Sequence, residues 1–332
     1  MSQPAVTRRT IAVAALGAML ADLVGAQTRP SDSSDFPSRA VRLVVPTPPG
    51  SAPDIRARQI AQKLAEDWQQ AVIVDNRPGA SGSIAMEFVA RAPADGYTLV
   101  LGNISYLAVL PHLAKLPVDP LKDLVPVSQV TAGPLVLVAH AGVPFNSLPG
   151  LIDHARTHPG KLNATGGGLG SLIHLAVTLL NKTAGVDITF IPSKGGGLDT
   201  AAVIGGQVQL LFEFASVIGP HVKSGRLKAL AVASDKRLAV LPEVPTFSEL
   251  GHAGMQIKGW QGILVPTGTP PEVIGKLNRA IVKVLGQPDI RESIISTGGE
   301  VGGDSPEQFA AFIRAEHARW GKVIAEAGIR LE

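Results

Sequence analysis

Three short loops, each placed between an apolar stretch and a helix-like pattern, are rich in glycine and hydroxyl side chains. They are PTPPGS (residues 46–51), GGGLGS (residues 166–171) and KGGG (residues 194–197). Because glycine has no Cβ atom, backbone N–H groups in such loops can approach a ligand closely, and a helix start attracts anions. A single loop of this kind is also explained as a tight turn. Several at one sheet edge favour an anion-binding site.

The residues expected to contact a ligand come from these loops and from the ends of neighbouring strands. They are Thr47, Pro48, Gly50, Ser51, Asn103, Gly168, Gly170, Ser171, Lys194, Gly195, Gly196 and Glu213. For Glu213, at the end of an apolar strand, capping a helix is the alternative role. We expect Ser171 and residues 47–51 to face each other and hold one carboxylate, so that losing one hydroxyl weakens binding by roughly tenfold to a hundredfold.

Other chemistries find no support in the motifs. The chain has no cysteine, and Ser171 stands where the last glycine of a G-x-G-x-x-G nucleotide motif would fall. There is no P-loop, no G-x-S-x-G nucleophile motif and no H-E-x-x-H zinc motif. His154 and His158 are interpreted as a solvated helix face, and His174 as a core or supporting histidine, with a ligand contact as its alternative. We therefore expect no enzyme activity, no cofactor and no metal.

The hydrophobic pattern predicts an α/β fold. Apolar runs at residues 43–45, 72–74 and 97–101 indicate strands that alternate with helices, which implies parallel pairing with the following loops at one edge. The pattern repeats at residues 162–180, 188–208 and 209–222, and a further strand is expected at 227–233.

Two long apolar segments, residues 125–138 and 255–266, are predicted to be strands that cross between two domains. We place domain 1 at residues 37–132 and 258–332, and domain 2 at residues 133–257. The tail is predicted to be helical, with a helix opening at Pro270 or Pro271 and another whose capping box is formed by Ser305 and Gln308.

The first 26 residues have the features of an export signal. Arg8 and Arg9 precede an apolar stretch at residues 11–20, and a small-residue cleavage site follows at residues 24–26. We expect the Sec route, with a twin-arginine signal as the alternative. The net charge of +3 includes no basic run, so no nucleic-acid partner is expected.

Several longer segments carry a family resemblance. VPTPPGSAPDIRARQIAQKL, the segment with NRPGA and DGYTL, IPSKGGGLDTAAVIGGQVQLLFE and the run ending LPEVPTFSELG together resemble the Bug family, the TctC-like solute receptors of tripartite tricarboxylate transporters. The resemblance covers essentially the whole chain after the leader. It implies a type II periplasmic binding protein fold, with two α/β domains joined by two crossing strands and a carboxylate held in the cleft between them.

The chain departs from the usual family pattern around the expected cleft. Thr47 stands where phenylalanine is usual and Ser51 where a second glycine is usual, while Glu213 and Phe214 replace an Asp-Asn pair. An aromatic residue is common where Ser193 stands. These departures bear on which ligand is bound.

The resemblance implies a periplasmic, monomeric protein that captures a small carboxylate and delivers it to the permease subunits of a tripartite tricarboxylate transporter. A ligand-binding partner of a membrane sensor is the alternative, and an exported enzyme on the same fold is a further one.

Overall fold

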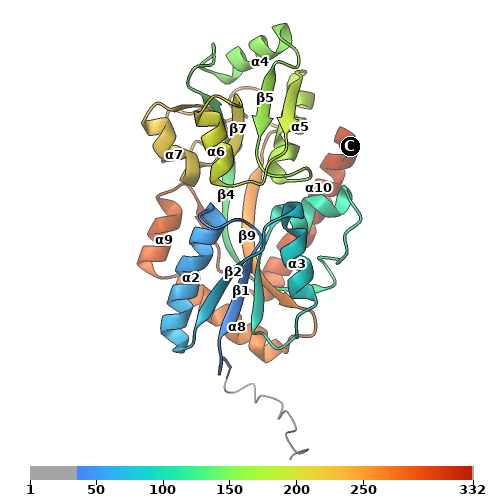
Figure 1. Ribbon diagram of the computed structural model, residues 1–332, viewed down its shortest axis with the longest axis vertical. Helices are drawn as coiled ribbons and strands as arrows, with labels where there is room; N and C mark the ends of the chain where they lie inside the picture. Colours follow the sequence, from blue (N-terminus) through green and yellow to red (C-terminus); the bar gives the residue numbers. More distant parts are fainter. Residues whose placement is uncertain (1–35, 331–332) are drawn as a thin grey trace, which may run out of the picture. The chain divides into compact units, whose positions relative to one another are not determined.

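The computed structural model describes residues 36–330, so the predicted leader and cleavage site lie outside the described residues (Figure 1). The strands are β1 (Val41–Val45), β2 (Val72–Asn76), β3 (Thr98–Asn103), β4 (Leu124–His140), β5 (Leu162–Thr165), β6 (Ile188–Ile191), β7 (Leu210–Phe214), β8 (Leu227–Val232), β9 (Lys258–Pro266) and β10 (Glu300–Val301). The α-helices are α2 (Ala52–Trp68), α3 (Ser83–Ala90), α4 (Leu148–Thr157), α5 (Leu172–Ala184), α6 (Gly197–Ile204), α7 (Ala215–Lys223), α8 (Pro271–Leu285), α9 (Pro288–Ile295) and α10 (Pro306–Ala327). Short turns of other helix types are η2 (Ala80–Gly82), η3 (Ser105–Val109) and η4 (Leu110–His112).

Strands β1, β2 and β3 pair in parallel, which confirms the pattern predicted from the sequence. Val41 of β1 is opposite Val72 of β2, and Arg42 is opposite Thr98 of β3. Leu43 and Val44 are fully buried, because both faces of this part of the sheet are covered. A continuous apolar run, instead of strict alternation, is therefore what β1 requires.

A second parallel set consists of β5, β6 and β7. Leu162 of β5 is opposite Ile188 of β6, and Ala164 is opposite Leu210 of β7. Each of these strands leads into a helix, in the order β5 to α5, β6 to α6 and β7 to α7. The strand order across the described sheet is β2-β1-β3-β9-β4-β7-β5-β6, with β8 and β10 also paired to β4.

Strand β4 belongs to both parts of the sheet. Residues 124–134 pair with β9, and residues 135–139 pair with β7 (Figure 1). The partner changes at Pro134, which has no N–H group to donate to a ladder. Leu135 is opposite Phe214 of β7, while its N–H still donates to the carbonyl of Ile257, just before β9. Strand β4 thus runs through both parts of the sheet, as predicted for residues 125–138, whereas β9 pairs only with β3 and with residues 124–134 of β4. The second crossing strand and the domain boundaries stay predictions.

The C-terminal helices form as their capping signals indicate. Helix α8 begins at Pro271, and α10 begins after Ser305 with a complete capping box in which Ser305 and Gln308 satisfy each other's backbone N–H groups. In the described part of the chain, no helix is both long and apolar enough to span a membrane.

Glycine is required in β9 at the point where α10 packs on the sheet. A Cβ atom on Gly262 would overlap the Phe309 ring and lie 2.9 Å from the Ser128 carbonyl oxygen. The backbone neighbour cannot move without disturbing the ladder. Gly262→Ala is therefore expected to lower the free energy of unfolding by about 1–3 kcal/mol or more in urea denaturation.

The matched control for this change is Gly219→Ala in α7. A Cβ atom there meets no atom within 4 Å, and alanine is favoured over glycine inside a helix. The control protein should be as stable as the parent or more stable. Equal stability of both variants would contradict the packing described for Gly262.

Candidate ligand-binding site

A cavity of about 570 Å³ lies where the two parallel sets of strands end and the following helices begin. Most of the residues predicted from the sequence line it. These are Thr47, Gly50, Ser51, Asn103, Ser171, Gly195, Gly196 and Glu213. Pro48, Gly168, Gly170 and Lys194 are not part of its lining, and the Lys194 side chain is exposed. The structure therefore brings together loops from both predicted domains. Their role in binding stays a prediction.

Four helices start at this cavity. Ala52 of α2, Leu172 of α5, Gly197 of α6 and Ala215 of α7 all line it. The first N–H groups of a helix have no partner inside the helix, and the helix dipole places partial positive charge at that end. Acidic side chains stand at three of these starts, Asp54 in α2, Asp199 in α6 and Glu213 beside α7, so α5 is the start whose positive end is not offset by an acid. The arrangement suits an anion.

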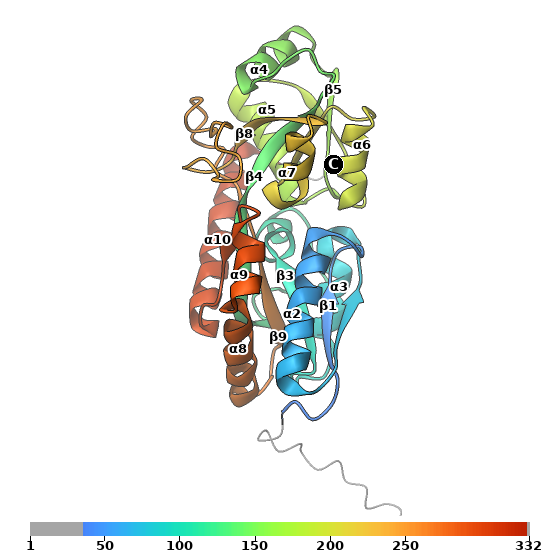
Figure 2. The same ribbon diagram turned by 90° about the vertical axis from the view of Figure 1, so that its left-hand side faces the viewer.

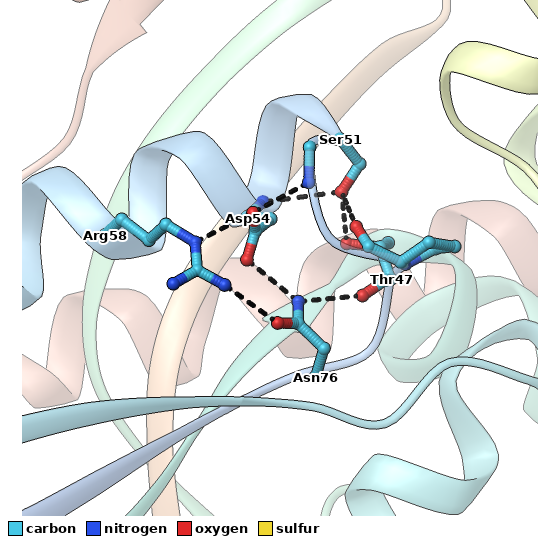
Figure 3. Close-up of polar contacts among 7 residues, drawn as sticks. Thr47, Ser51, Asp54, Arg58 and Asn76 are labelled. Carbon is cyan, nitrogen blue, oxygen red and sulfur yellow. Dashed lines mark hydrogen bonds and ion pairs between the residues drawn. The ribbon is translucent and has the colours of Figure 1, made fainter.

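The loop before α2 is fixed by a network around Asp54 (Figure 3). One carboxylate oxygen of Asp54 accepts from Gly50 N at 2.8 Å and from Arg58 Nε at 3.0 Å, and the other accepts from Asn76 Nδ2 at 2.8 Å. Asn76 also donates to the Thr47 carbonyl at 3.0 Å. Burial alone would raise the pKa of Asp54, but these hydrogen bonds outweigh it and lower the pKa below its usual value.

The hydroxyl groups of Ser51 and Ser171 are used within the protein. Ser51 Oγ accepts from Asp54 N and donates to the Pro48 carbonyl at 2.8 Å. Ser171 Oγ accepts from His174 N at 3.1 Å and donates to the Gly166 carbonyl at 3.0 Å. Both serines are helix N-caps. This differs from the sequence-based expectation, in which the two hydroxyls donate to the ligand, because each has a single proton and that proton already has an acceptor.

Other polar groups of the glycine loops are also bonded internally. Gly170 N donates to His174 Nδ1 at 3.2 Å, and Ser193 Oγ accepts from Gly167 N at 2.9 Å. His174 does not line the cavity, and burial lowers its pKa. These bonds agree with the interpretation of His174 as a supporting residue that shapes the loop.

Two acids line the part of the cavity formed by α6 and α7. Asp199, in the first turn of α6, is 2% exposed and accepts from Gly167 N at 3.1 Å. Glu213, the residue before the N-cap of α7, is 7% exposed, and its Oε1 accepts from Phe214 N at 2.8 Å. Burial raises the pKa of Glu213 to about 7, against the lowering effect of this hydrogen bond. The carboxyl group is therefore partly protonated near neutral pH.

Two direct hydrogen bonds join loops that come from the two parallel sets of strands. Ser81 Oγ donates to the Leu169 carbonyl at 3.0 Å, and Leu172 N donates to Ser105 Oγ at 3.1 Å. Ser81 has a positive φ of 52°, an uncommon conformation for a residue with a side chain. The contacts hold the cavity in the form described here.

Several lining residues were not identified from the sequence. Arg56 and Gln59 come from α2, Ser105 follows β3, Trp260 and Gln261 lie in β9, and Phe214 precedes α7. For Arg56 a signal existed, because it lies one turn after Ala52 and Pro53 at the helix start. For Gln261 there was none, since either face of a crossing strand can be turned to the cavity.

Phe214 fits behind the cavity because two glycines leave space for it. Gly133 of β4 is opposite Gly259 of β9, and a Cβ atom on Gly259 would overlap the Phe214 ring and lie 3.3 Å from Leu172. The back of the cavity is thus apolar. Across residues 36–330, no group of three or more His, Cys, Asp or Glu side chains gathers in a way that could hold a metal ion.

Comparison with known proteins decides the family. Residues 56–329 match the family model described as the tripartite tricarboxylate transporter family receptor, TctC. The chain belongs to this receptor family. It is 37% identical over 305 residues to protein BugT of Bordetella pertussis, which covers 91% of this chain and 94% of that protein.

Solved structures of TctC-type receptors share the fold. A protein of R. palustris solved with adipate has a TM-score of 0.85 and 35% identity, covering 89% of this chain and 100% of that one. MatC from Rhodopseudomonas palustris with bound malate has a TM-score of 0.83 and 33% identity, covering 87% and 100%. The predicted α/β fold of a periplasmic binding protein is confirmed, and so is the predicted family.

The two cavity serines are expected to act mainly on stability. Ser51→Ala and Ser171→Ala each remove an N-cap, which should lower the free energy of unfolding by about 0.5–2 kcal/mol. The affinity for a carboxylate should change only a few fold, because neither hydroxyl proton is free. Chemical denaturation and calorimetric titration measure the two effects separately.

The control is Ser305→Ala, which removes a cap on α10 outside the cavity lining. All three variants should lose similar stability. A loss of affinity of tenfold or more in both cavity variants, with none in the control, would show that the hydroxyls turn toward the ligand when it binds.

Glu213 is expected to make stability depend on pH. Its pKa is raised in the folded protein, so the folded state keeps a proton that the unfolded state releases between about pH 4.5 and about pH 7. Stability should fall as the pH rises through this window, by roughly 3 kcal/mol in total. Glu213→Gln should remove this loss, so the variant is more stable than the parent at pH 8 and similar to it at pH 4.

Urea denaturation at a series of pH values measures this difference. Glu243→Gln, at an exposed position, is the matched control and should follow the parent at every pH. A parent and a Glu213→Gln protein with parallel stability curves would contradict the burial of an ionisable group at this site.

Proposed function

We propose that this receptor captures a small carboxylate in the cavity and delivers it to the membrane permease of a tripartite tricarboxylate transporter. The observation that carries the proposal is the start of α5, which lines the cavity beside three other helix starts and has no acidic residue in its first turn. Unpaired N–H groups and helix dipoles favour a negative group there. The two relatives solved with adipate and with malate bind acids of the same class.

Export is part of the proposal. Arg8 and Arg9, the apolar stretch after them and the small-residue site at 24–26 form a leader that the Sec pathway would remove. The mature receptor would then act as a monomer in the periplasm. Its family and the description of a similar solved structure as a periplasmic transporter support this location.

We further propose that the ligand is bound without being changed. Among the described residues, the cavity lining contains no histidine, lysine or cysteine, so the usual pairs of nucleophile and base do not form there. The lining serines with assigned hydrogen bonds cap helices or bond to neighbouring residues. The carboxyl groups of Asp199 and Glu213 each accept a backbone N–H instead of orienting a nucleophile.

A panel of mono-, di- and tricarboxylates tests the proposal. At a ligand concentration of 100 times Kd, binding to the folded state alone adds about 2.7 kcal/mol of stability, which a thermal-shift assay detects. We expect at least one acid of the panel to shift the midpoint and its uncharged amide to have no effect. Nuclear magnetic resonance after long incubation should recover the acid unchanged.

Two results would count against this function. One is a panel in which no carboxylate raises the midpoint. The other is turnover of the acid that persists through purification and disappears when a cavity residue is changed.

A further inference from the structure

Arg56 is a basic side chain in the cavity lining that has no acidic partner. It lies in α2, is half buried and faces α9. No carboxylate of residues 36–330 comes within ion-pair distance of it, whereas Arg58, two residues further along α2, pairs with Asp54. Burial lowers the pKa of Arg56, since the charged guanidinium loses solvation there. A buried charge without a partner is unfavourable unless something else supplies the opposite charge.

Neutral groups hold the Arg56 guanidinium in place. Nη1 donates to Gln59 Oε1 at 2.7 Å and to Ser293 Oγ at 2.6 Å, and Nη2 donates to the Ser293 carbonyl at 3.2 Å. Ser293 therefore occupies the edge between Nη1 and Nη2. Its own hydroxyl proton goes to the Ile290 carbonyl, so Ser293 Oγ is fixed as an acceptor.

The adjacent edge of the guanidinium, formed by Nε and Nη2, has no acceptor for its two N–H groups among the described residues. A guanidinium has five N–H donors in one plane, and three are used by Gln59 and Ser293. The remaining two, on Nε and Nη2, lie side by side and find no acceptor among the described residues. This paired edge has the geometry that a carboxylate accepts with both oxygens.

A different set of donors lies at the start of α5. The Asn103 side chain uses its carbonyl oxygen for Tyr106 N, which leaves its NH₂ group without a protein partner in the described chain. Ser105 Oγ accepts from Leu172 N, so its own proton can still be donated to a ligand. The first turn of α5 contains no acidic residue. An anionic group can thus be bound there by neutral donors and the helix dipole.

The acids of the cavity do not neutralise Arg56. Asp199 is engaged by Gly167 N and Glu213 by Phe214 N, both in the part formed by α6 and α7. The cavity therefore offers two separate places for an anionic group. One is the cationic Arg56, and the other is the start of α5 with its neutral donors. The apolar Phe214 also lines the cavity.

We propose that the cavity selects an organic dicarboxylate, in which one carboxylate is held by the neutral donors at the start of α5 and the other by the Nε–Nη2 edge of Arg56. This rests on the proposed function and adds to it a specificity-determining residue, Arg56, for the second carboxylate. Because the guanidinium is already fixed by Ser293 and Gln59, little side-chain freedom is lost when the second carboxylate binds.

The test compares adipate with hexanoate, two six-carbon acids that differ by one carboxylate, on the parent protein and on Arg56→Gln. Calorimetric titration of the parent should show tighter binding of adipate. In Arg56→Gln, adipate should bind about tenfold to a hundredfold more weakly, while hexanoate changes less than about threefold. Adipic acid monoamide on the parent should bind about as weakly as adipate does to the variant.

Arg291→Gln is the matched control, because it removes the same charge from an exposed position on α9 outside the cavity lining. It should leave both affinities unchanged. Arg56→Lys keeps the charge without the paired edge and should give an intermediate adipate affinity. Denaturation curves of all variants confirm that each is folded.

Each remaining outcome overturns the inference. Equal losses for adipate and hexanoate would mean that Arg56 supports the whole cavity and not a second carboxylate. An unchanged adipate affinity in Arg56→Gln would remove Arg56 from the binding site while leaving carboxylate binding intact. A parent protein that binds monocarboxylates but no dicarboxylate would reject the ligand class alone, whereas one that binds no acid at all would reject the proposed function too.

Discussion

The N–H groups in the first turn of an α-helix have no acceptor within that helix, and the site depends on this constraint. Parallel strands place the helices that follow them at the same edge, so each parallel set in this sheet turns its helix starts toward the cavity. Capping by Ser51 and Ser171 satisfies part of each first turn. The donors that remain, together with the dipoles, set the sign of the charge that the cavity accepts.

Acidic side chains offset the partial positive charge at three of the four helix starts. Asp54 lies in the first turn of α2, Asp199 in that of α6, and Glu213 beside the start of α7. Helix α5 has no such residue, so its positive end is left for a ligand. Arg56 supplies a full charge elsewhere in the cavity. The electrostatic character of the cavity therefore arises from a few buried charges and not from the net charge of the chain.

Local signals allowed much of the fold to be predicted. The apolar run of β1, the period of α2 and the capping box of α10 are each contained in a few neighbouring residues, and the crossing strand β4 is marked by its length and by Pro134. The glycine loops also lie at the cavity as expected. Side-chain roles were harder to predict. The hydroxyl protons of Ser51 and Ser171 are donated to carbonyls that the loop conformation brings near. The guanidinium of Arg56 is held by Ser293, which is 237 residues away in the sequence.

Helix α10 packs along one side of the molecule and contacts both parts of the sheet. Near its start Phe309 packs at Gly262 of β9, and in its middle Glu316 accepts the indole N–H groups of Trp260 and Trp320. At its end the Glu326 carbonyl accepts from Lys182 of α5, so the helix fastens both parts of the sheet (Figure 2). Helices α2 and α6 start away from α10, where Gly196 and Ser51 approach each other across the cavity. On the α10 side the two parts of the sheet are thus joined by contacts with one continuous helix, whereas at the starts of α2 and α6 they meet where Ser51 and Gly196 approach each other.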